Sequence, residues 1–544
     1  MKKTTFLKAT CIILLCGMSS YGYATDLYLT ATCGNDMNNG TLGHPVATLS
    51  KALTIAQAND IIHVTGFIDI SAEPNKAGVR TDISFFGSSI YEVGGVTYKT
   101  WNLGGNMGII TLNKPLTIIG DDKTTCGFDG KNITRLIRQD GSISGIITYK
   151  NLTFKNGNSA PNADKGGAIY IRSSKATFVN CEFANNTSGS TFKGGAVYFD
   201  NYNNTKTITS FTSCHFVGNF GKAGSALFAT SGALDFDGCS FQNNSSNTNT
   251  TSDGGGAINI WMYGAVNLLV KNTVFENNTS TMNGGALFIN DVPTKVANAK
   301  ITFINCAFNK NTVTGPYVGG AAYFENKNVG VFDIAFINST FSNNSVGGNN
   351  SGAICMNTAK TGSLFNLTNC TITDNKVAGD NGLAGAGIRF NNNSNTDICS
   401  MNAVKTIYNT IIDNNTAIDW DKIASNKYAD LVVAGDAYIK DVDLIIRNSF
   451  IAGTSNLNLK NDMGETNKIN YAKDINNNLS PTSVVKLKPY NSVNHTYSLQ
   501  PTSSAINFGD SNYLIKLNIS TDQVGTSRLF KNNKCDAGAI EVSK

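Results

Sequence analysis

A tetrapeptide of two glycines, an alanine and an aliphatic residue recurs through the middle of this 544-residue chain. The first copy is Gly166-Gly167-Ala168-Ile169, and copies or close variants begin at residues 166, 194, 224, 255, 284, 319, 351 and 385. The steps between them are 28, 30, 31, 29, 35, 32 and 34 residues. A near-constant period of this size indicates a repeat protein, in which each unit buries its apolar face only against its neighbours.

A second motif alternates with the first, a phenylalanine followed three residues later by an asparagine. Its phenylalanines are Phe183, Phe216, Phe241, Phe275, Phe308 and Phe341. Two residues before the phenylalanine stands a small residue, which is Cys181, Cys214, Cys239, Thr273, Cys306 or Ser339. This interchange of Cys with Thr and Ser predicts a small inward slot that holds free thiols. A disulfide between neighbouring units, such as Cys181 with Cys214, is the alternative.

One unit, residues 166–193, divides into three predicted strands at 168–171, 176–179 and 181–183. Polar residues 172–175 form a turn, Asn180 allows a left-handed break, and residues 185–193 form a loop of variable length. After each Gly-Gly-Ala, apolar residues alternate with period two, as at Ile169 and Ile171. No stripe with helical spacing is present. We therefore predict an all-β, single-stranded right-handed parallel β-helix, with coils ~4.8 Å apart.

The ends of the chain depart from the repeat. Residues 27–64 predict an N-terminal cap with a short helix at 48–58, and residues 71–110 predict an insertion. We expect residues 25–150 to hold the cap and first coils, 151–420 the repeat coils, 421–495 late coils with an irregular insertion, and 496–544 a C-terminal closing segment.

Residues 1–24 are typical of a signal peptide, because Lys2 and Lys3 precede an apolar stretch and Gly22-Tyr23-Ala24 offers a cleavage site. The mature chain is therefore expected to be secreted or on the outer surface, with no membrane-spanning segment. Lipid attachment at Cys16 is the alternative, although Leu15 stands where a small residue is expected. A net charge of +5 without a basic cluster in the mature chain argues against nucleic acid as a partner.

The strongest candidate for a binding site is the outward column of the first strand in each unit. It reads Tyr170, Tyr198, Phe228, Asn259, Phe288, Tyr323, Cys355 and Arg389, and is expected to lie beside a floor of outward alanines. Aromatic rings next to polar groups can hold an extended glycan. We predict a ligand site at Tyr170, Tyr198, Phe228, Trp261, Phe288, Tyr323 and Arg389. Two alternatives are that the rings only stabilise the sheet or that loops fold over them.

The sequence names no catalytic residue, metal site or cofactor. The acidic pair Asp121-Asp122 follows Gly120 in a turn, and Asp200 and Glu325 are several coils apart. The four histidines, His44, His63, His215 and His495, show no metal-ligand spacing, and His215 is expected to face solvent.

Two resemblances follow from these motifs. The alternation of Gly-Gly-Ala with Phe-x-x-Asn over residues 166–390 resembles the repeat of the chlamydial polymorphic outer membrane proteins, which implies a surface-exposed, adhesive role. That family's C-terminal barrel strands have no counterpart in this sequence. The opening Gly34-Asn35-Asp36 and the close at residues 499–541, with Asp522, Arg528 and Asp536-Ala537-Gly538-Ala539-Ile540-Glu541, resemble secreted bacterial β-helix proteins of the pectate-lyase-like superfamily.

Two classes of function remain open from the sequence. The first is a non-catalytic, adhesin-like protein that binds a polysaccharide or another cell-surface ligand. The second is a polysaccharide lyase or glycoside hydrolase, which shares the fold. A cluster of at least two outward carboxylates with Arg or Lys within one or two coils would favour the enzyme.

Overall fold

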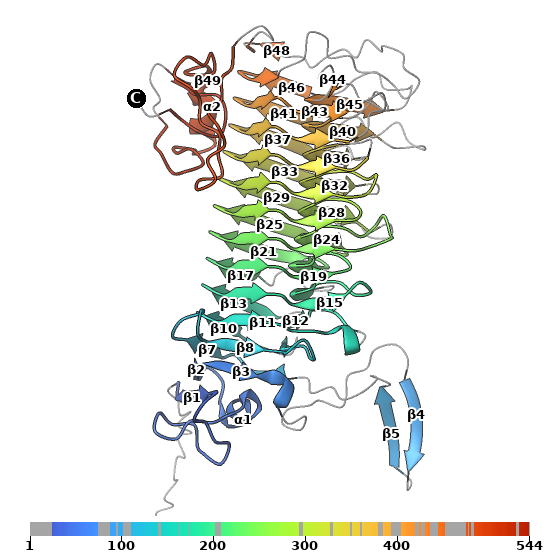
Figure 1. The fold of residues 1–544 in the computed structure, drawn as a ribbon, viewed down its shortest axis with the longest axis vertical. Coiled ribbons are helices and arrows are strands. Elements are labelled where there is room, and N and C mark those ends of the chain that lie inside the picture. Colours follow the sequence, from blue (N-terminus) through green and yellow to red (C-terminus); the bar gives the residue numbers. More distant parts are fainter. Residues whose placement is uncertain are drawn as a thin grey trace, which may run out of the picture.

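The chain winds into a tall stack of coils (Figure 1), a parallel β-solenoid as predicted. The computed structural model describes residues 24–542 except 74–87, 94–95, 102–109, 140–142, 163, 173, 202–207, 293–296, 327–329, 349–350, 359–361, 379–384, 393–403, 419–423, 426–429, 436–443, 452–474, 477, 480–483 and 529–532. Most of the predicted signal peptide, including Cys16, lies outside these residues.

The coils from β13 to β45 each pass through four sheets, which we number in the order the chain visits them, and sheet 3 begins at β15. Sheet 1 contains β1 (Asp26–Thr30), β2 (Ile61–Thr65), β7 (Thr117–Gly120), β10 (Ile146–Lys150), β13 (Lys175–Val179), β17 (Ile208–Thr212), β21 (Gly232–Asp237), β25 (Val266–Lys271), β29 (Ala299–Ile304), β33 (Phe332–Ile337), β37 (Leu364–Thr368), β41 (Val404–Tyr408), β46 (Leu444–Arg447) and β48 (Ile475–Asn476). Sheet 2 contains β3 (Phe67–Asp69), β8 (Gly127–Asp129), β11 (Thr153–Lys155), β14 (Glu182–Ala184), β18 (His215–Val217), β22 (Ser240–Gln242), β26 (Val274–Glu276), β30 (Ala307–Asn309), β34 (Thr340–Ser342), β38 (Thr371–Thr373), β42 (Ile411–Asp413) and β47 (Phe450–Ile451).

The other two sheets complete the coil. Sheet 3 contains β15 (Thr187–Gly189), β19 (Phe220–Gly221), β23 (Ser245–Ser246), β27 (Thr279–Ser280), β31 (Thr312–Val313), β35 (Ser345–Val346), β39 (Lys376–Val377), β43 (Thr416–Ile418) and β44 (Ala424–Ser425). Sheet 4 contains β6 (Thr111–Leu112), β9 (Ile137–Gln139), β12 (Ile169–Arg172), β16 (Val197–Asp200), β20 (Leu227–Ala229), β24 (Ile258–Met262), β28 (Leu287–Asp291), β32 (Ala322–Asn326), β36 (Ile354–Thr358), β40 (Ile388–Asn392) and β45 (Leu431–Gly435). The sequence predicted three strands in each coil, and the structure corrects this number to four. The additional strand belongs to sheet 3 and lies near the start of the predicted variable loop.

The core is filled by columns of side chains from successive coils. The rings of Phe183, Phe216 and Phe241 stack at 4.6 Å between centroids, and a second stack through Phe178 and Phe211 meets the first edge-on. The apolar columns predicted to point inward, headed by Ile169 and Ile171, are buried throughout. The Cys slot is also confirmed: the described thiols in it are free and buried, and Thr273 and Ser339 use it to donate to a carbonyl two residues earlier.

The two glycines of each repeat are needed for different physical reasons. Gly284 has φ +64°, and a Cβ there would stand 2.1 Å from the Leu287 carbonyl oxygen. A Cβ on Gly285 would stand 2.0 Å from the Gly320 carbonyl oxygen of the next coil. The first glycine therefore makes the turn, and the second lets two backbones approach closely. The alanine that follows in seven of the eight units is fully buried against the core, as at Ala286, which corrects the expectation of an outward alanine floor.

The asparagine of the Phe-x-x-Asn motif forms a buried ladder through the stack. Asn244 donates from its backbone N and from Nδ2 to Asn278 Oδ1 of the next coil, at 3.1 and 2.9 Å. Its Nδ2 also donates to the Phe216 carbonyl at 3.0 Å. The ladder consists of Asn186, Asn219, Asn244, Asn278, Asn311, Asn344, Asn375 and Asn415. It supplies partners to the backbone where the chain turns from sheet 2 into sheet 3.

The predicted N-terminal helix is present as α1 (Leu49–Ile55). The Thr48 side chain caps it by accepting a hydrogen bond from Lys51 N at 3.1 Å, and Leu49 and Ala52 pack on the core. In the predicted insertion, β4 (Ser88–Val93) pairs with β5 (Val96–Trp101) as an antiparallel hairpin. None of the described helices is long and apolar enough to cross a membrane.

The C-terminal segment lies along the flank of the stack, beside the late coils (Figure 1), and we call the described residues 484–528 and 533–542 the clasp. It contains α2 (Ser511–Lys516) and the antiparallel pair β49 (Gly509–Asp510) and β50 (Lys534–Cys535). It packs on the outer face of sheet 2, where Leu499, Ala505 and Ala537 contact Ile411 and Phe450. The predicted closing segment thus covers a side of the solenoid.

Candidate functional site

The outward column of sheet 4 points away from the core as predicted, but other residues cover it. The exposed fractions are 8% for Tyr170, 4% for Tyr198, 1% for Phe228, 0% for Phe288, 4% for Tyr323 and 7% for Arg389, whereas Trp261 is half-buried. Tyr170, Tyr198 and Phe228 stack on one another, and Phe288 stacks on Tyr323. The geometry therefore matches both alternatives raised above, stacking within the sheet and cover by loops. Ligand binding by these residues stays a prediction.

The cover comes from the residues just before the first glycine of each unit. Lys165 Nζ lies 4.6 Å from the Tyr198 ring centroid, and Lys193 Nζ lies 4.8 Å from that of Phe228. Ala223 packs with the same rings. Because the positive-φ glycine turns the chain outward, each of these segments reaches over the ring of the following coil. The variable loops thus place cations on aromatic faces, where they are attracted by the ring quadrupole.

At the N-terminal end of the column, two arginines lie over Tyr170. Their Cζ atoms are 5.5 Å (Arg135) and 4.9 Å (Arg138) from its ring centroid. Arg135 also pairs with Asp164 at 2.6 Å, and the Tyr170 hydroxyl donates to Asp200 at 2.6 Å. Burial, and then Asp200, raise the pKa of Tyr170 above its usual range. Tyr170 therefore stays protonated and acts as a hydrogen-bond donor.

Further along, Asp253 is shared by two lysines. Its carboxylate lies 2.5 Å from Lys193 Nζ and 3.0 Å from Lys222 Nζ, and Lys193 Nζ also lies 3.0 Å from the Trp261 ring centroid. Burial, and then Lys222 and Lys165, lower the pKa of Lys193 to about 8 against the pull of Asp253. Burial alone would raise the pKa of Asp253, but Lys193 and its other partners hold it below its usual value. One carboxylate thus stays ionised between two ammonium groups.

We call this set the cation–aromatic cluster, consisting of Arg135, Arg138, Lys165, Lys193 and Lys222 with Tyr170, Tyr198, Phe228 and Trp261. Its side chains differ in their access to solvent. Asp253 and Arg135 are buried, whereas the Lys222 and Asp164 side chains are 24% and 27% exposed. Lys165 and Trp261 are half-buried. A ligand approaching from outside therefore meets the two lysines and the tryptophan before the other rings.

The second half of the column differs in its chemistry. Tyr323 donates to Glu325 at 2.7 Å, Val318 packs on the rings, and Cys355 lies opposite Arg389 in the pairing of β36 with β40. Burial raises the pKa of Cys355 to about 12, so it carries no charge at neutral pH. The predicted site residues therefore fall into two groups, and cations lie over the rings of the N-terminal group.

The other candidates from the sequence stay apart. Asp122 accepts from Thr124 N at 2.8 Å in its turn. Asp200 on β16 and Glu325 on β32 are separated in sheet 4 by β20, β24 and β28. Each of these two carboxylates accepts from a tyrosine of its own neighbourhood. The described residues include no group of three or more His, Cys, Asp or Glu side chains that could hold a metal ion.

His215 faces solvent as predicted. It belongs to an outward column of sheet 2 that was not predicted from the sequence. Glu182, His215 and Ser240 are register partners on sheet 2, and His215 Nδ1 lies 2.8 Å from Ser240 Oγ. The backbone N–H groups of all three donate to the preceding coil. None of these three N–H groups is therefore free to stabilise an oxyanion.

Sequence reasoning missed Lys193, Lys222 and Asp253, because these residues lie in segments without a period. One signal was present: the residue before the first glycine is lysine in two consecutive units, Lys165 and Lys193.

No family model matches the chain, and no curated protein matches it. Among solved structures, the crystal structure of pectate lyase Pel9A is similar over 96% of this chain and 98% of its own, with 13% identity and a TM-score of 0.37. A rhamnogalacturonan lyase is similar over 93% of this chain and 99% of its own, with 12% identity and a TM-score of 0.33. At these identities and TM-scores, neither similarity bears on the activity of this chain.

Proposed function

We propose that this protein is a non-catalytic, adhesin-like protein, secreted or held at the cell surface, that binds an acidic polysaccharide along its cation–aromatic cluster. The observation that carries the proposal is the excess of positive charge there. Among the described residues of the cluster, Arg135, Arg138, Lys165, Lys193 and Lys222 face three carboxylates, Asp164, Asp200 and Asp253. A row in which cations outnumber carboxylates attracts anions.

The arrangement also favours a polymer over a small molecule. The cations stand on consecutive coils, which repeat every ~4.8 Å. They therefore form a row parallel to the solenoid axis, and Trp261 adds a half-buried ring at one end. Substitution of Tyr170 or Tyr198 would not test the proposal, because both are buried and their loss would leave cavities.

The experiment measures binding of the purified protein to polygalacturonate and to uncharged dextran by isothermal titration calorimetry. We expect binding to polygalacturonate only, and roughly tenfold weaker binding when Lys165→Gln and Lys222→Gln are combined. The matched control combines Lys175→Gln and Lys300→Gln, which remove two exposed lysines from sheet 1. Equal affinity of the two double variants would exclude this cluster as the site.

One observation favours a lyase as the second candidate. A lysine with a pKa of about 8 can act as a base near neutral pH, and Lys193 has this property. Abstraction of the C5 proton next to a uronate carboxylate would form a C4=C5 double bond as the C4–O glycosidic bond breaks. The leaving oxygen would take a proton from water, and the unsaturated product would absorb in the ultraviolet. Incubation of polygalacturonate with the wild type and with Lys193→Met distinguishes the candidates. Absorbance that appears and depends on Lys193 would replace the binding role with an enzymatic one.

A further inference from the structure

We infer that the clasp is a docked module that leaves the solenoid as a unit while the coils stay wound, and that it controls access to the outer face of sheet 2 over β30 to β47. The inference rests on four features: the internal structure of the clasp, its contacts with the coils, the place where it docks and the surface that it hides.

The clasp has hydrogen-bonded structure of its own. β49 pairs with β50, and isolated bridges join Leu487 to Leu499 and Thr521 to Ser527. Asp522 accepts from the backbone N of Val524 and Thr526, at 2.9 and 2.8 Å, and its second oxygen accepts from Glu541 N. In the part of the chain that the structure describes, no strand of the clasp joins the four solenoid sheets. Its departure would therefore break no sheet ladder.

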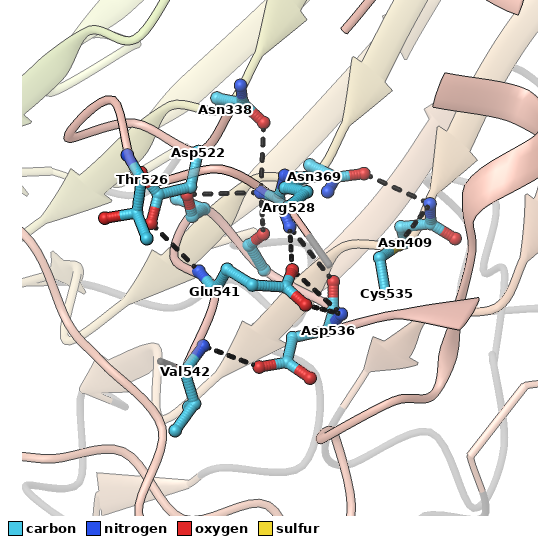
Figure 2. A network of polar contacts seen from close by, with 12 residues as sticks. Asn338, Asn369, Asn409, Asp522, Thr526, Arg528, Cys535, Asp536, Glu541 and Val542 are labelled. Atoms are coloured by element: carbon cyan, nitrogen blue, oxygen red, sulfur yellow. Dashed lines mark hydrogen bonds and ion pairs between the residues drawn. The ribbon is translucent and has the colours of Figure 1, made fainter. Parts of the chain in front are cut away.

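Arg528 is the centre of the clasp (Figure 2). Its guanidinium is fully buried and pairs with Glu541 at 2.9 Å, while NH2 donates to the Gly538 carbonyl at 3.0 Å. Across the interface, the same NH2 donates to Asn338 Oδ1 at 3.0 Å. Asn338 Nδ2 in turn donates to the Thr521 carbonyl at 2.7 Å. Arg528 thus holds the clasp together and also fastens it to a turn of the solenoid.

Most of the other contacts across the interface also involve side chains, and one joins two backbones, from Gly538 N to the Asn409 carbonyl at 2.7 Å. Thr340 Oγ1 donates to Gln523 Oε1 at 2.6 Å, and Ala539 N donates to Thr371 Oγ1 at 3.0 Å. Asn409 exchanges hydrogen bonds with the backbone of Asp510, at 2.9 and 3.1 Å. A small apolar cluster around Ile411 and Phe450 completes the interface.

The clasp docks on a column of left-handed turn residues between sheets 1 and 2. Beneath the clasp, this column consists of asparagines: Asn338, Asn369, Asn409 and Asn448. Earlier coils have Asn151, Asn180, Ser213, Gly238, Asn272 and Asn305 at the same position. Gly238 has no side chain and Ser213 has no carboxamide, so neither could replace Asn338 as a partner of Arg528 and of the clasp backbone.

The clasp hides one half of a continuous face. On β14, β18, β22 and β26, the outward residues of sheet 2 are exposed or half-buried except Ala184: Glu182, His215, Val217, Ser240, Gln242, Val274 and Glu276. Under the clasp, the equivalent residues are at most 4% exposed except the half-buried Asp413: Ala307, Asn309, Thr340, Ser342, Thr371, Thr373, Ile411 and Phe450. Release of the clasp would therefore extend the open face along the axis.

The protein carries its own reporters for this motion. Cys535 is buried at the interface, with Sγ 3.7 Å from Asn409 Nδ2. Cys181, Cys214 and Cys239 are buried inside the coils, and Cys33 is exposed. Alkylation of the native protein with iodoacetamide, followed by peptide mass spectrometry, gives a rate for each thiol. The rate at exposed Cys33 measures the reactivity of the reagent with an accessible thiol. The rate at Cys535 measures how often the clasp leaves the coils, and the rates at the core thiols measure unwinding of the coils.

We expect Cys535 to react at least tenfold faster than Cys181, Cys214 and Cys239 in the wild type. Asn338→Ala should increase the rate of alkylation of Cys535 about tenfold and leave the rates of the core thiols unchanged. Asn272→Ala is the matched control, because it changes a left-handed asparagine of the same column outside the clasp. Thr340→Val provides a second interface variant without a backbone effect.

Equal rates for Cys535 and the core thiols in the wild type would overturn the inference, because the clasp would then leave only when the coils unwind. The same conclusion would follow if Asn338→Ala or Thr340→Val accelerated all of these thiols together.

Discussion

At the scale of single residues, the buried asparagine ladder replaces water as the hydrogen-bond partner of the turns. We expect Asn278→Ala to lower the free energy of unfolding by about 3 kcal/mol, because Asn244 N, Asn244 Nδ2 and the Phe241 carbonyl lose their partners together. Urea unfolding followed by circular dichroism measures the change. Asn267→Ala, on the exposed face of β25, is the control and should change stability little. A similar small loss for both variants would show that the ladder is dispensable.

One residue at the end of the ladder is an acid. Asp430 Oδ1 accepts from Asn415 N and Nδ2, at 3.2 and 2.7 Å, as the next asparagine would, and burial raises the pKa of Asp430 to about 8. Because the folded protein holds this proton more tightly than the unfolded chain, the contribution of Asp430 to stability declines as pH rises from about 4 to about 8. Asp430→Asn should therefore be more stable than the wild type at pH 9, by thermal unfolding. Equal melting temperatures at pH 9 would contradict this.

At the scale of the structural element, the turn into sheet 4 depends on the absence of two side chains. A Cβ on Gly285 would stand 2.0 Å from a backbone oxygen of the next coil, which cannot move without separating two strands. We expect Gly285→Ala to destabilise the protein by several kcal/mol, about as much as severe overpacking of a core. Gly43→Ala is the control, because a Cβ on Gly43 would meet no atom within 4 Å. Chemical denaturation of both variants checks the prediction, which fails if Gly285→Ala unfolds at the wild-type midpoint.

At the scale of the whole molecule, the charge of one loop lysine should affect binding along the solenoid. Because burial lowers the pKa of Lys193 to about 8, this side chain loses its proton well before an ordinary lysine does. Binding of polygalacturonate should therefore weaken between pH 7 and pH 9. Titration calorimetry of Lys193→Gln should show weaker binding at pH 7 and less dependence on pH. An affinity that stays constant across this range in the wild type would contradict the prediction.

The sequence by itself determined how the chain winds. Inward apolar residues alternate with period two inside each strand, and each recurs once per coil, as Ile169 and Val197 do. The pattern within a strand and the stacking of neighbouring coils therefore specify the same solenoid. The free thiol slot and the helix capped by Thr48 follow from equally local rules. The buried asparagine ladder was visible as a motif, but its hydrogen bonds depend on the turn geometry of two adjacent coils.

Only the tertiary structure decided which outward residues are covered. Lys193 and Asp253 come from loops of different coils, and no period links their positions. The clasp brings Arg528 to Asn338 across 190 residues, and neither residue belongs to a shared strand. Outward side chains have no common partner dictated by the stack, so their burial depends on loop lengths and distant contacts. A column of aromatics in the sequence therefore predicts a stack of rings but does not predict whether solvent reaches it.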